Sequence, residues 1–404
     1  MKLNKSYKFR LYPNQQQRVL LDKTFGCNRF VWNNALSYRN DLYASRKEFY
    51  NKYDSIKDLK QVKDLDEYNF LKEVDSMSLQ QTLIDLDQTF NNFFRKIKQG
   101  QKSSVKFKSK DSKQSYRTNN VNNNIQLNFN SKRIKIPKLG LVKFKDKRHF
   151  DYKIKSVTIS KTKTNKYFVS ILTEYEFKIN KPTTINYNKV FSADMSAKQF
   201  MVSNEMEFEN QKFYRNNERK LKIRQRRLSK KQKGSNNKLK SKLVVASLHE
   251  KIVNKRRGYQ KNLVHYLTTK FDVFCFEDLN IDSMKQFNKG ISKTVTLDFS
   301  WNEFLTFLEQ KCNSTNKHFV KIDRWFPSSK MCSSCGTVKD ELSLSQRTYN
   351  CICGLEINRD LNASINIKNE GLSQLLKIKK EYNLIKKPTD LMLESNALGV
   401  MNSQ

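Results

Sequence analysis

The segment 332–360 decides the fold. It reads Cys332-Ser-Ser-Cys335, then fifteen residues, then Cys351-Ile-Cys353, and soon afterwards Asn358-Arg359-Asp360. Two cysteine-containing turns about fifteen residues apart are typical of a zinc ribbon. Four thiolates complete the tetrahedron of Zn²⁺, so we predict a closed structural site and not a catalytic one. The alternatives are an accidental cluster and a disulfide pair. In either case this module runs directly into an acidic residue that begins a helix.

The composition indicates a polyanionic partner. The 404 residues carry a formal net charge of +39, and nucleic acid is the first candidate because neutralised phosphates release condensed counterions. A membrane surface is the second candidate, but the charge is spread along the chain and no apolar run is long enough to span a bilayer. The start of the chain also lacks the apolar core of a signal peptide. The cysteine usage fits a reducing compartment, so we expect a cytoplasmic protein.

The first half of the chain predicts one composite unit. Alternating side chains in residues 3–11 predict a half-buried strand, and apolar residues at helical spacing in 16–46 and 78–97 predict amphipathic helices. Residues 102–177 read as short strands separated by turns. The expected parts are a small β-barrel (1–12 and 101–180), a helical insertion (13–100) and a linker (181–187).

Three acids in the second half suggest a catalytic site. Asp194 and Glu277 each end an apolar strand, and Asp360 opens a helix. This order fits a ribonuclease H-like sheet, in which clustered carboxylates hold two divalent cations that act on a phosphodiester. Mg²⁺ is expected because hard cations prefer oxygen ligands. Each acid taken singly is more often a solvated loop residue or a helix cap, and we expect the neighbouring Asp278 and Asp323 to be structural.

Between the two acidic strands, residues 215–270 predict two very basic helices joined by a turn at 230–237. A charge run is usually a solvated face, but this one is placed to meet the substrate, and we expect it to contact phosphates. The candidates are Arg224, Arg226, Arg227, Lys230, Lys231, Lys255, Arg256 and Arg257. Four aromatic residues among basic neighbours either stack on bases or belong to the core: Tyr50, Tyr53, Phe107 and Tyr116.

Several segments resemble one family. Arg324-Trp-Phe-Pro-Ser-Ser-Lys-Met-Cys332, the two cysteine turns and Arg359-Asp360-Leu-Asn-Ala are similar to the C-terminal signature of TnpB, the transposon-encoded ancestor of type V CRISPR effectors. Phe276-Glu277-Asp278-Leu-Asn resembles its second acidic motif, and Lys106-Phe-Lys-Ser-Lys resembles a motif nearer the start. The resemblance extends from about residue 5 to residue 368, and its C-terminal motif is highly specific.

The resemblance implies an RNA-guided DNA endonuclease from a prokaryote. It implies a guide RNA from the transposon end and double-stranded target DNA read at a short adjacent motif, as in other guided effectors. It also implies Mg²⁺ on Asp194, Glu277 and Asp360, and a monomeric protein. The implied domains are a wedge barrel with a helical recognition insertion, a RuvC domain (188–325 and 356–369), an inserted zinc ribbon (326–355) and a flexible tail (370–404).

Two motifs depart from the family pattern. The first acidic motif reads Ser192-Ala193-Asp194-Met195-Ser196 where the family usually has Gly-Ile-Asp-Leu-Gly, and Asn358 stands where the family often has aspartate. Some relatives have lost catalytic acids and act as RNA-guided repressors. All three acids are present here, which favours cleavage. The alternatives are a silent RNA-guided binder and an accessory transposase.

Overall fold

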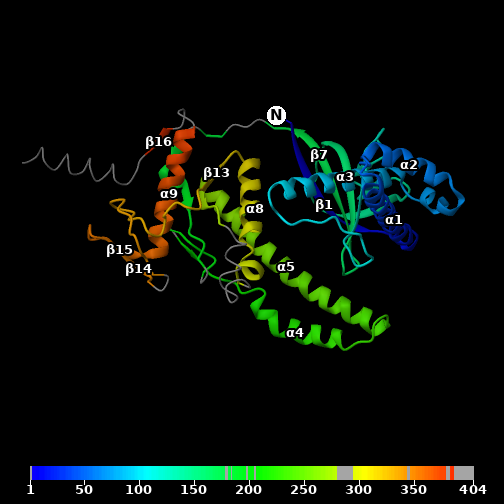
Figure 1. Ribbon diagram of the computed structural model, residues 1–404. Helices are drawn as coiled ribbons and strands as arrows, with labels where there is room; N and C mark the ends of the chain where they lie inside the picture. The colour runs from blue at the N-terminus through cyan, green and yellow to red at the C-terminus, as the bar shows by residue number, and fades with distance from the viewer. Residues whose placement is uncertain are drawn as a thin grey trace, which may run out of the picture. The chain divides into compact units, whose positions relative to one another are not determined.

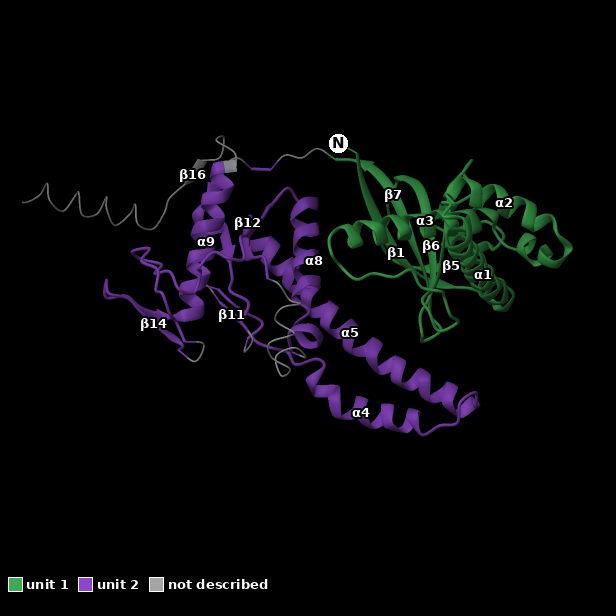
Figure 2. Ribbon diagram, in the orientation of Figure 1, with its two compact units in different colours: residues 1–178 green, residues 179–404 purple. Residues whose placement is uncertain are grey.

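The chain divides into two compact units, residues 1–178 and 179–404 (Figure 2). The computed structural model describes residues 2–177, 181–182, 184–196, 199–203, 206–279, 294–343, 346–378 and 383–385. Each unit combines helices with a sheet, which confirms the mixed α/β class. No helix among these residues is both long and apolar enough to cross a membrane.

A seven-stranded antiparallel sheet forms the centre of the first unit, in the order β2-β6-β7-β1-β5-β4-β3. Its strands are β1 (Lys2–Tyr12), β2 (Gln114–Asn119), β3 (Gln126–Asn128), β4 (Arg133–Ile136), β5 (Gly140–Lys145), β6 (Lys153–Lys161) and β7 (Tyr167–Glu176). The predicted N-terminal strand is confirmed as β1, which lies in the middle and pairs with β7 and β5. Alternate side chains of β1 (Tyr7, Phe9, Leu11) enter the core.

The helices of this unit are inserted between β1 and β2, as the sequence predicts. They are α1 (Gln15–Arg46), α2 (Lys52–Asp64), the short 3-10 helix η1 (Asp66–Glu73) and α3 (Ser76–Lys98) (Figure 1). Helix α1 begins at a capping box in which the side chains of Asn14 and Gln17 satisfy each other's backbone N–H groups. Trp32 and Leu36 of α1 share a core with Leu83 of α3, so apolar periodicity explains this packing.

Three parallel strands order the second unit. They are β9 (Val190–Ser192), β12 (Val273–Glu277) and β13 (His318–Ile322), with β12 in the middle. Helices α5 (Asn236–Lys270) and α8 (Trp301–Ser314) cover one face and meet Phe274 and Phe276. Helix α9 (Arg359–Ile378) covers the other face and meets Val273 and Cys275. Side chains that alternate along β12 therefore separate the two faces.

The remaining elements are short, apart from helix α4 (Arg215–Ser229). They are β8 (Thr184–Asn186), η2 (Tyr187–Lys189), β10 (Met201–Val202), β11 (Glu207–Phe208), the π-helix η3 (Thr294–Phe299), β14 (Thr348–Asn350), β15 (Glu356–Asn358) and β16 (Asn383–Ile385). Strands β14 and β15 form an antiparallel hairpin that leads straight into α9.

Two predicted irregular segments contain regular structure. The predicted linker 181–187 includes β8, which pairs in parallel with β16. The predicted tail from residue 370 was placed too early, because α9 continues to Ile378. Leu372 and Leu375 hold it there, since both are buried in the same core as Ile367. The rest of the predicted tail, apart from β16, lies outside the described residues.

Helix α9 approaches β12 closely at Gly371. A Cβ built on Gly371 would lie 2.4 Å from Sγ and 2.7 Å from Cβ of Cys275. Both atoms belong to a fully buried side chain on the central strand. Glycine is therefore required here by packing and not by its backbone conformation.

Gly371→Ala is expected to destabilise the protein by about 1–3 kcal/mol, because overpacking forces α9 away from β12. The matched control is Gly258→Ala in α5, where an added Cβ meets nothing within 4 Å and helix propensity favours alanine by about 1 kcal/mol. Urea unfolding monitored by circular dichroism measures both. Equal stability of Gly371→Ala and the wild type would contradict the close packing.

Candidate active site and metal centre

The three predicted acids lie on one face of the parallel sheet. Glu277 ends β12 and has the parity of Val273 and Cys275, which face α9. Asp194 lies two residues beyond Ser192, whose hydroxyl donates to the backbone oxygen of Ser364 in α9 at 2.7 Å. The carboxyl ends of parallel strands share one edge of a sheet, which is where α/β proteins bind ligands. Both acids therefore point to the α9 side of that edge.

Asp360 completes the group from the first turn of α9. The side-chain oxygen of Asn358 accepts the backbone N–H groups of Asp360 at 2.9 Å and Leu361 at 3.2 Å. Asn358 thus caps the helix, which gives a local role to one departure from the family motif. A carboxylate in the first turn is also stabilised by the helix dipole.

Electrostatics shows that the acids act on one another. Burial, together with the negative charges of Glu277 and Asp360, raises the pKa of Asp194 to about 7 against the opposing effect of Arg359. Burial also raises the pKa of Glu277, while a hydrogen bond from Ser328 opposes this. Desolvated carboxylates that repel one another favour a bound cation or proton. The donor set therefore fits a hard divalent cation.

The carboxylates are more widely spaced than the ligands of a closed metal site. Among the described residues, the cysteines form the only group of three or more candidate ligands whose atoms all lie within 4.8 Å of one another. Asp360 instead contacts Arg359 at 3.4 Å and Arg347 at 3.9 Å. The two other strand-end acids have structural partners, as expected: Asp278 pairs with Arg324 at 2.5 Å, and Asp323 accepts the N–H of Trp325 at 2.7 Å.

Ser328 connects Glu277 to helix α9. Its hydroxyl donates to Oε1 of Glu277, and its backbone oxygen accepts a hydrogen bond from the Asn366 side chain at 2.8 Å. The same Asn366 amide donates to the backbone oxygen of Met331 at 2.7 Å. Ser328 is only 6% exposed. The serine was not predicted as a site residue, because its partners come from distant parts of the chain.

Asn362 connects the first cysteine turn to the same helix. Its amide donates to the backbone oxygen of Met331 at 2.7 Å, and its side-chain oxygen accepts the N–H of Ser333 at 2.9 Å. Asn362 is fully buried and lies one helical turn before Asn366. Two asparagines four residues apart among apolar residues are the sequence signal that marks this contact.

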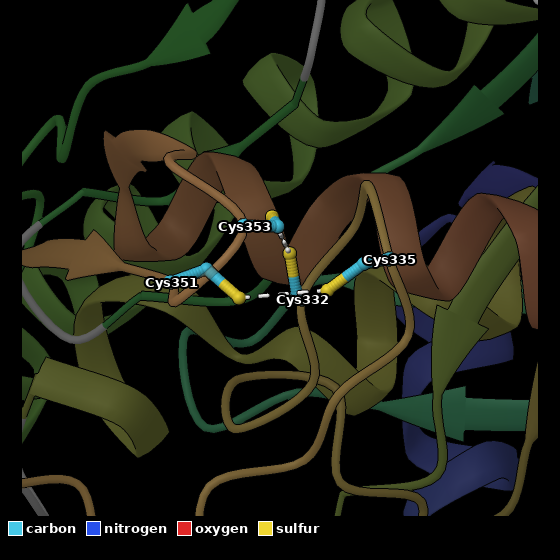
Figure 3. Close-up of side chains that lie close together, drawn as sticks. All are labelled: Cys332, Cys335, Cys351 and Cys353. Atoms are coloured by element: carbon cyan, nitrogen blue, oxygen red, sulfur yellow. Dashed lines mark hydrogen bonds between the residues drawn. The ribbon is translucent and has the colours of Figure 1, made fainter.

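The four predicted cysteines converge (Figure 3). The sulfur atoms of Cys332 and Cys353 lie 3.7 Å apart, and those of Cys335 and Cys351 lie 3.5 Å apart. Both distances exceed the disulfide bond length of about 2.05 Å. They approach the separation of roughly 3.8 Å expected between thiolates of a tetrahedral site with Zn–S bonds of about 2.3 Å. The four cysteines can therefore hold a structural metal ion such as Zn²⁺.

Each cysteine turn closes on a glycine, which lies four residues after Cys332 and three residues after Cys351. The N–H of Gly336 donates to the oxygen of Cys332, and the N–H of Gly354 donates to that of Cys351, each at 3.0 Å. Both glycines have positive φ, 78° and 86°, which other residues adopt at a cost. Hydrogen bonds from Thr337 lower the pKa of the Cys335 thiol to about 6, which favours the thiolate that a metal requires.

The basic helices α4 and α5 form a long antiparallel hairpin (Figure 1). Its root is fixed by Asp298, whose carboxylate accepts the N–H groups of Tyr214 at 2.6 Å and Arg215 at 3.2 Å. Of the eight predicted phosphate contacts, six are exposed, and Arg224 and Arg256 are half-buried. The exposed six are Arg226, Arg227, Lys230, Lys231, Lys255 and Arg257.

Arg256 and Arg257 form hydrogen bonds and ion pairs with residues of η3 and α8. Arg256 donates to the backbone oxygen of Leu297 at 2.7 Å and contacts Glu303 at 3.4 Å, and its side chain is only 11% exposed. Its guanidinium is therefore engaged by η3 and α8, and a phosphate contact at Arg256, which stays a prediction, would require these bonds to break. Arg257 also pairs with Glu303, at 2.7 Å, but its side chain is 49% exposed.

The four aromatic candidates separate into two pairs. Tyr50 and Tyr116 are buried, and the hydroxyl of Tyr50 donates to Asp58 at 2.6 Å. Tyr53 is 72% exposed and Phe107 is 58% exposed. Stacking on a base is therefore open only to Tyr53 and Phe107.

Three family models match the chain. A model described as "Probable transposase" matches residues 170–288, "Cas12f1-like, TNB domain" matches 301–367, and "Helix-turn-helix domain" matches 1–48. The last range holds strand β1 and the single long helix α1 in this structure. Together the three models cover the acidic strands, the cysteine site and the start of the chain.

Two bacterial relatives match nearly the whole chain. A protein of Streptomyces pristinaespiralis, "Putative RNA-guided DNA endonuclease", is 31% identical over 92% of this chain and 90% of its own length. InsQ of Escherichia coli (strain K12), with the same description, is 29% identical over 92% of this chain and 93% of its own. A solved chain from a Cas12f1–sgRNA–target DNA complex is a distant likeness, with TM-score 0.47 and 13% identity over 91% of this chain and 99% of its own.

The acidic sheet edge and the adjoining four-cysteine site define a protein with two distinct candidate metal centres, and the family model that covers Asp194 and Glu277 describes a probable transposase. The length and identity of the match to the Streptomyces relative then settle the family. The chain belongs to the TnpB family, as its sequence motifs indicated.

Cys335→Ser is expected to reduce the bound metal to less than one zinc per chain, because three thiolates no longer close the tetrahedron. Elemental analysis of purified protein measures this. Ser314→Ala, which changes an exposed helix-end hydroxyl far along the chain from the cysteines, is the control and keeps the wild-type metal content. A wild-type protein that contains no zinc would contradict the assignment.

Asp194→Asn is expected to stabilise the protein more at about pH 8 than at about pH 5, in buffer without added divalent cations. The folded state keeps the Asp194 proton up to about pH 7, whereas the unfolded chain loses it near pH 4. The wild type therefore loses stability as pH rises through this window, and asparagine does not. Thermal melting at both pH values measures the difference. A Tm difference that does not change with pH would contradict the raised pKa, and Asp323→Asn is the control.

Proposed function

We propose that this protein is an RNA-guided DNA endonuclease that hydrolyses phosphodiester bonds with Mg²⁺. The observation that carries the proposal is the convergence of Asp194, Glu277 and Asp360 on one face of the sheet. Mutual repulsion and burial leave Asp194 half-protonated near neutral pH. The Streptomyces and Escherichia coli relatives, both described as putative RNA-guided DNA endonucleases, support the same activity.

The chemistry is divided between the metal ions and the protein. The carboxylates of Asp194, Glu277 and Asp360 would hold Mg²⁺, and Asp194 would give up its proton on becoming a ligand. The metal would supply activation of water and stabilisation of the leaving oxygen of the phosphodiester. Arg359 and Arg347 lie beside Asp360 and add positive charge where a phosphate would approach. Ser328 holds the orientation of Glu277 through its hydroxyl.

The cysteine site has a structural role in this proposal. Zn²⁺ held by Cys332, Cys335, Cys351 and Cys353 would close the ribbon and leave no open coordination position for substrate. The ribbon is joined to α9 through Asn362. The zinc therefore fixes the approach to Asp360 and does no chemistry of its own.

The family layout gives the domains that we propose. Residues 1–12 and 101–180 form the wedge barrel, 13–100 form the recognition insertion, and 326–355 form the zinc ribbon. The RuvC domain comprises 188–325 and a C-terminal part that begins at 356. We extend this last part from residue 369 to Ile378, because α9 continues that far over the sheet.

The partners in this proposal are a guide RNA from the transposon end and double-stranded DNA that carries a short adjacent motif. The protein acts as a monomer in the cytoplasm of a prokaryote. The α4–α5 hairpin contacts phosphates through its exposed or partly exposed basic side chains. Its root takes no part in these contacts. The proposed contacts are Arg224, Arg226, Arg227, Lys230, Lys231, Lys255 and Arg257.

The decisive test is to purify the chain with its transposon-end RNA, sequence the bound RNA, and present a DNA library with a randomised adjacent motif. Mg²⁺-dependent double-strand cleavage is expected, and Asp194→Ala is expected to lower its rate by a factor of about a thousand or more, because the metal loses a ligand. Binding of target DNA should survive this change. Asp323→Ala is the control and should cleave normally.

Other outcomes would favour the alternatives. Guide-dependent binding of DNA that stays uncut with Mg²⁺ present would identify an RNA-guided repressor. Strand transfer without RNA would identify a transposase. Full cleavage by Asp194→Ala would contradict the assignment of the catalytic acids.

A further inference from the structure

An extended segment between α3 and β2 is fixed rigidly against helix α1. The side chain of Asn33 pairs with the backbone of Lys108 on both sides, accepting its N–H at 2.8 Å and donating to its oxygen at 2.9 Å. The indole N–H of Trp32 donates to the backbone oxygen of Lys106 at 3.1 Å. Val105 packs against the core of the helices. Three hydrogen bonds from one helix therefore set the direction of each side chain in this segment.

In this segment an aromatic side chain is exposed and a lysine side chain lies inward, which is the reverse of what packing alone favours. Phe107 is 58% exposed, whereas the next residue, Lys108, lies over the ring of Trp32 with its ammonium 3.4 Å from the ring centroid. Burial lowers the pKa of Lys108 to about 8, so the inward position opposes its charge. Burying the aromatic ring and exposing the lysine would favour the isolated fold. The exposed ring is therefore held outward at the expense of stability, which indicates a partner.

The surroundings of Phe107 are strongly basic. Residues 101–113 contain five lysines and one acid, Asp111. Four of these lysines are exposed: Lys102, Lys106, Lys110 and Lys113. Another exposed ring, Phe49, has Glu48 beside it and contacts Tyr43 at a centroid distance of 5.8 Å. Phe49 also has Arg46, Lys47 and Lys52 near it in the sequence, so Phe107 differs from it in having no acid within three positions.

We propose that Phe107 is a stacking platform for an unpaired base of a bound nucleic acid strand, with the exposed lysines around it on the flanking phosphates. Proteins that hold single strands combine a basic surface with aromatic rings because every base has a stacking face. A protein partner is disfavoured, since covering the ring would also desolvate several ammonium groups. The inference rests on the proposed function, because it names where the chain would hold part of its RNA or DNA. Lys108 supports the platform through Trp32 and contacts no phosphate.

The test measures the affinity of the full-length chain for three fluorescein-labelled probes at one fixed salt concentration: a single-stranded RNA, the single-stranded DNA of the same sequence, and the duplex DNA. Phe107→Ala is expected to weaken binding of a single strand about tenfold, the size of one lost stacking contact. Phe107→Trp keeps a ring and should bind within about twofold of the wild type, whereas Phe107→Leu keeps apolar volume without the ring and should resemble alanine. Phe49→Ala is the matched control for an exposed ring and should bind normally.

The outcomes show whether the bound strand is RNA or DNA. They also distinguish failure of the stacking platform from failure of the proposed function. A loss with RNA alone assigns the platform to the guide, a loss with single-stranded DNA alone assigns it to a DNA strand, and a loss with both supports either strand. Unchanged affinity of Phe107→Ala for both single strands overturns the platform while leaving the proposed function intact. A lower Tm with an equal loss on all three probes also overturns it, because the ring would then pack within the chain. A wild type that binds none of the probes contradicts both proposals.

Discussion

Two buried asparagines on one helix hold the candidate active site together. Asn362 and Asn366 lie one turn apart on α9, are almost fully buried, and donate to the backbone of the segment that leads into the first cysteine turn. That segment begins with Ser328, which orients Glu277, and Asp360 lies in the first turn of α9. A buried backbone oxygen that loses its donor costs about 1–3 kcal/mol. The acids and the cysteine site therefore share one hydrogen-bonded frame.

Helix α9 is also held against the parallel sheet by contacts at several points along its length. Ser192 reaches the backbone of α9 beside the first acidic strand, and Gly371 allows the helix to lie directly on Cys275 of the second. Leu372 and Leu375 then close the core at its far end. Because one rigid element meets both strands and the ribbon, a small displacement at any contact would change the spacing of all three carboxylates. Metal sites depend on such outer partners to orient their ligands.

The sequence could predict what depends on local pattern. Alternation and helical spacing located β1, α1, α3 and the acidic strands, and cysteine spacing located the metal site. The contacts of Ser328 and Asn366 could not be predicted, because each joins residues 35 or more positions apart and serine and asparagine have no strong pattern. The internal partners of Arg256 could not be predicted for a related reason. Composition counts its charge, but only the fold shows its bonds to Glu303 and Leu297.

Asn366 acts on the acids through Ser328, and the affinity of the chain for Mn²⁺ measures this effect. Electron paramagnetic resonance can count free Mn²⁺ in titrations of the wild type, Asn366→Ala and the control Gln374→Ala, whose amide lies further along α9 and bonds to Glu370. We expect Asn366→Ala to bind Mn²⁺ about 10- to 100-fold more weakly, with zinc content unchanged, while the control binds normally. Wild-type Mn²⁺ affinity in a folded, zinc-loaded Asn366→Ala protein would contradict it.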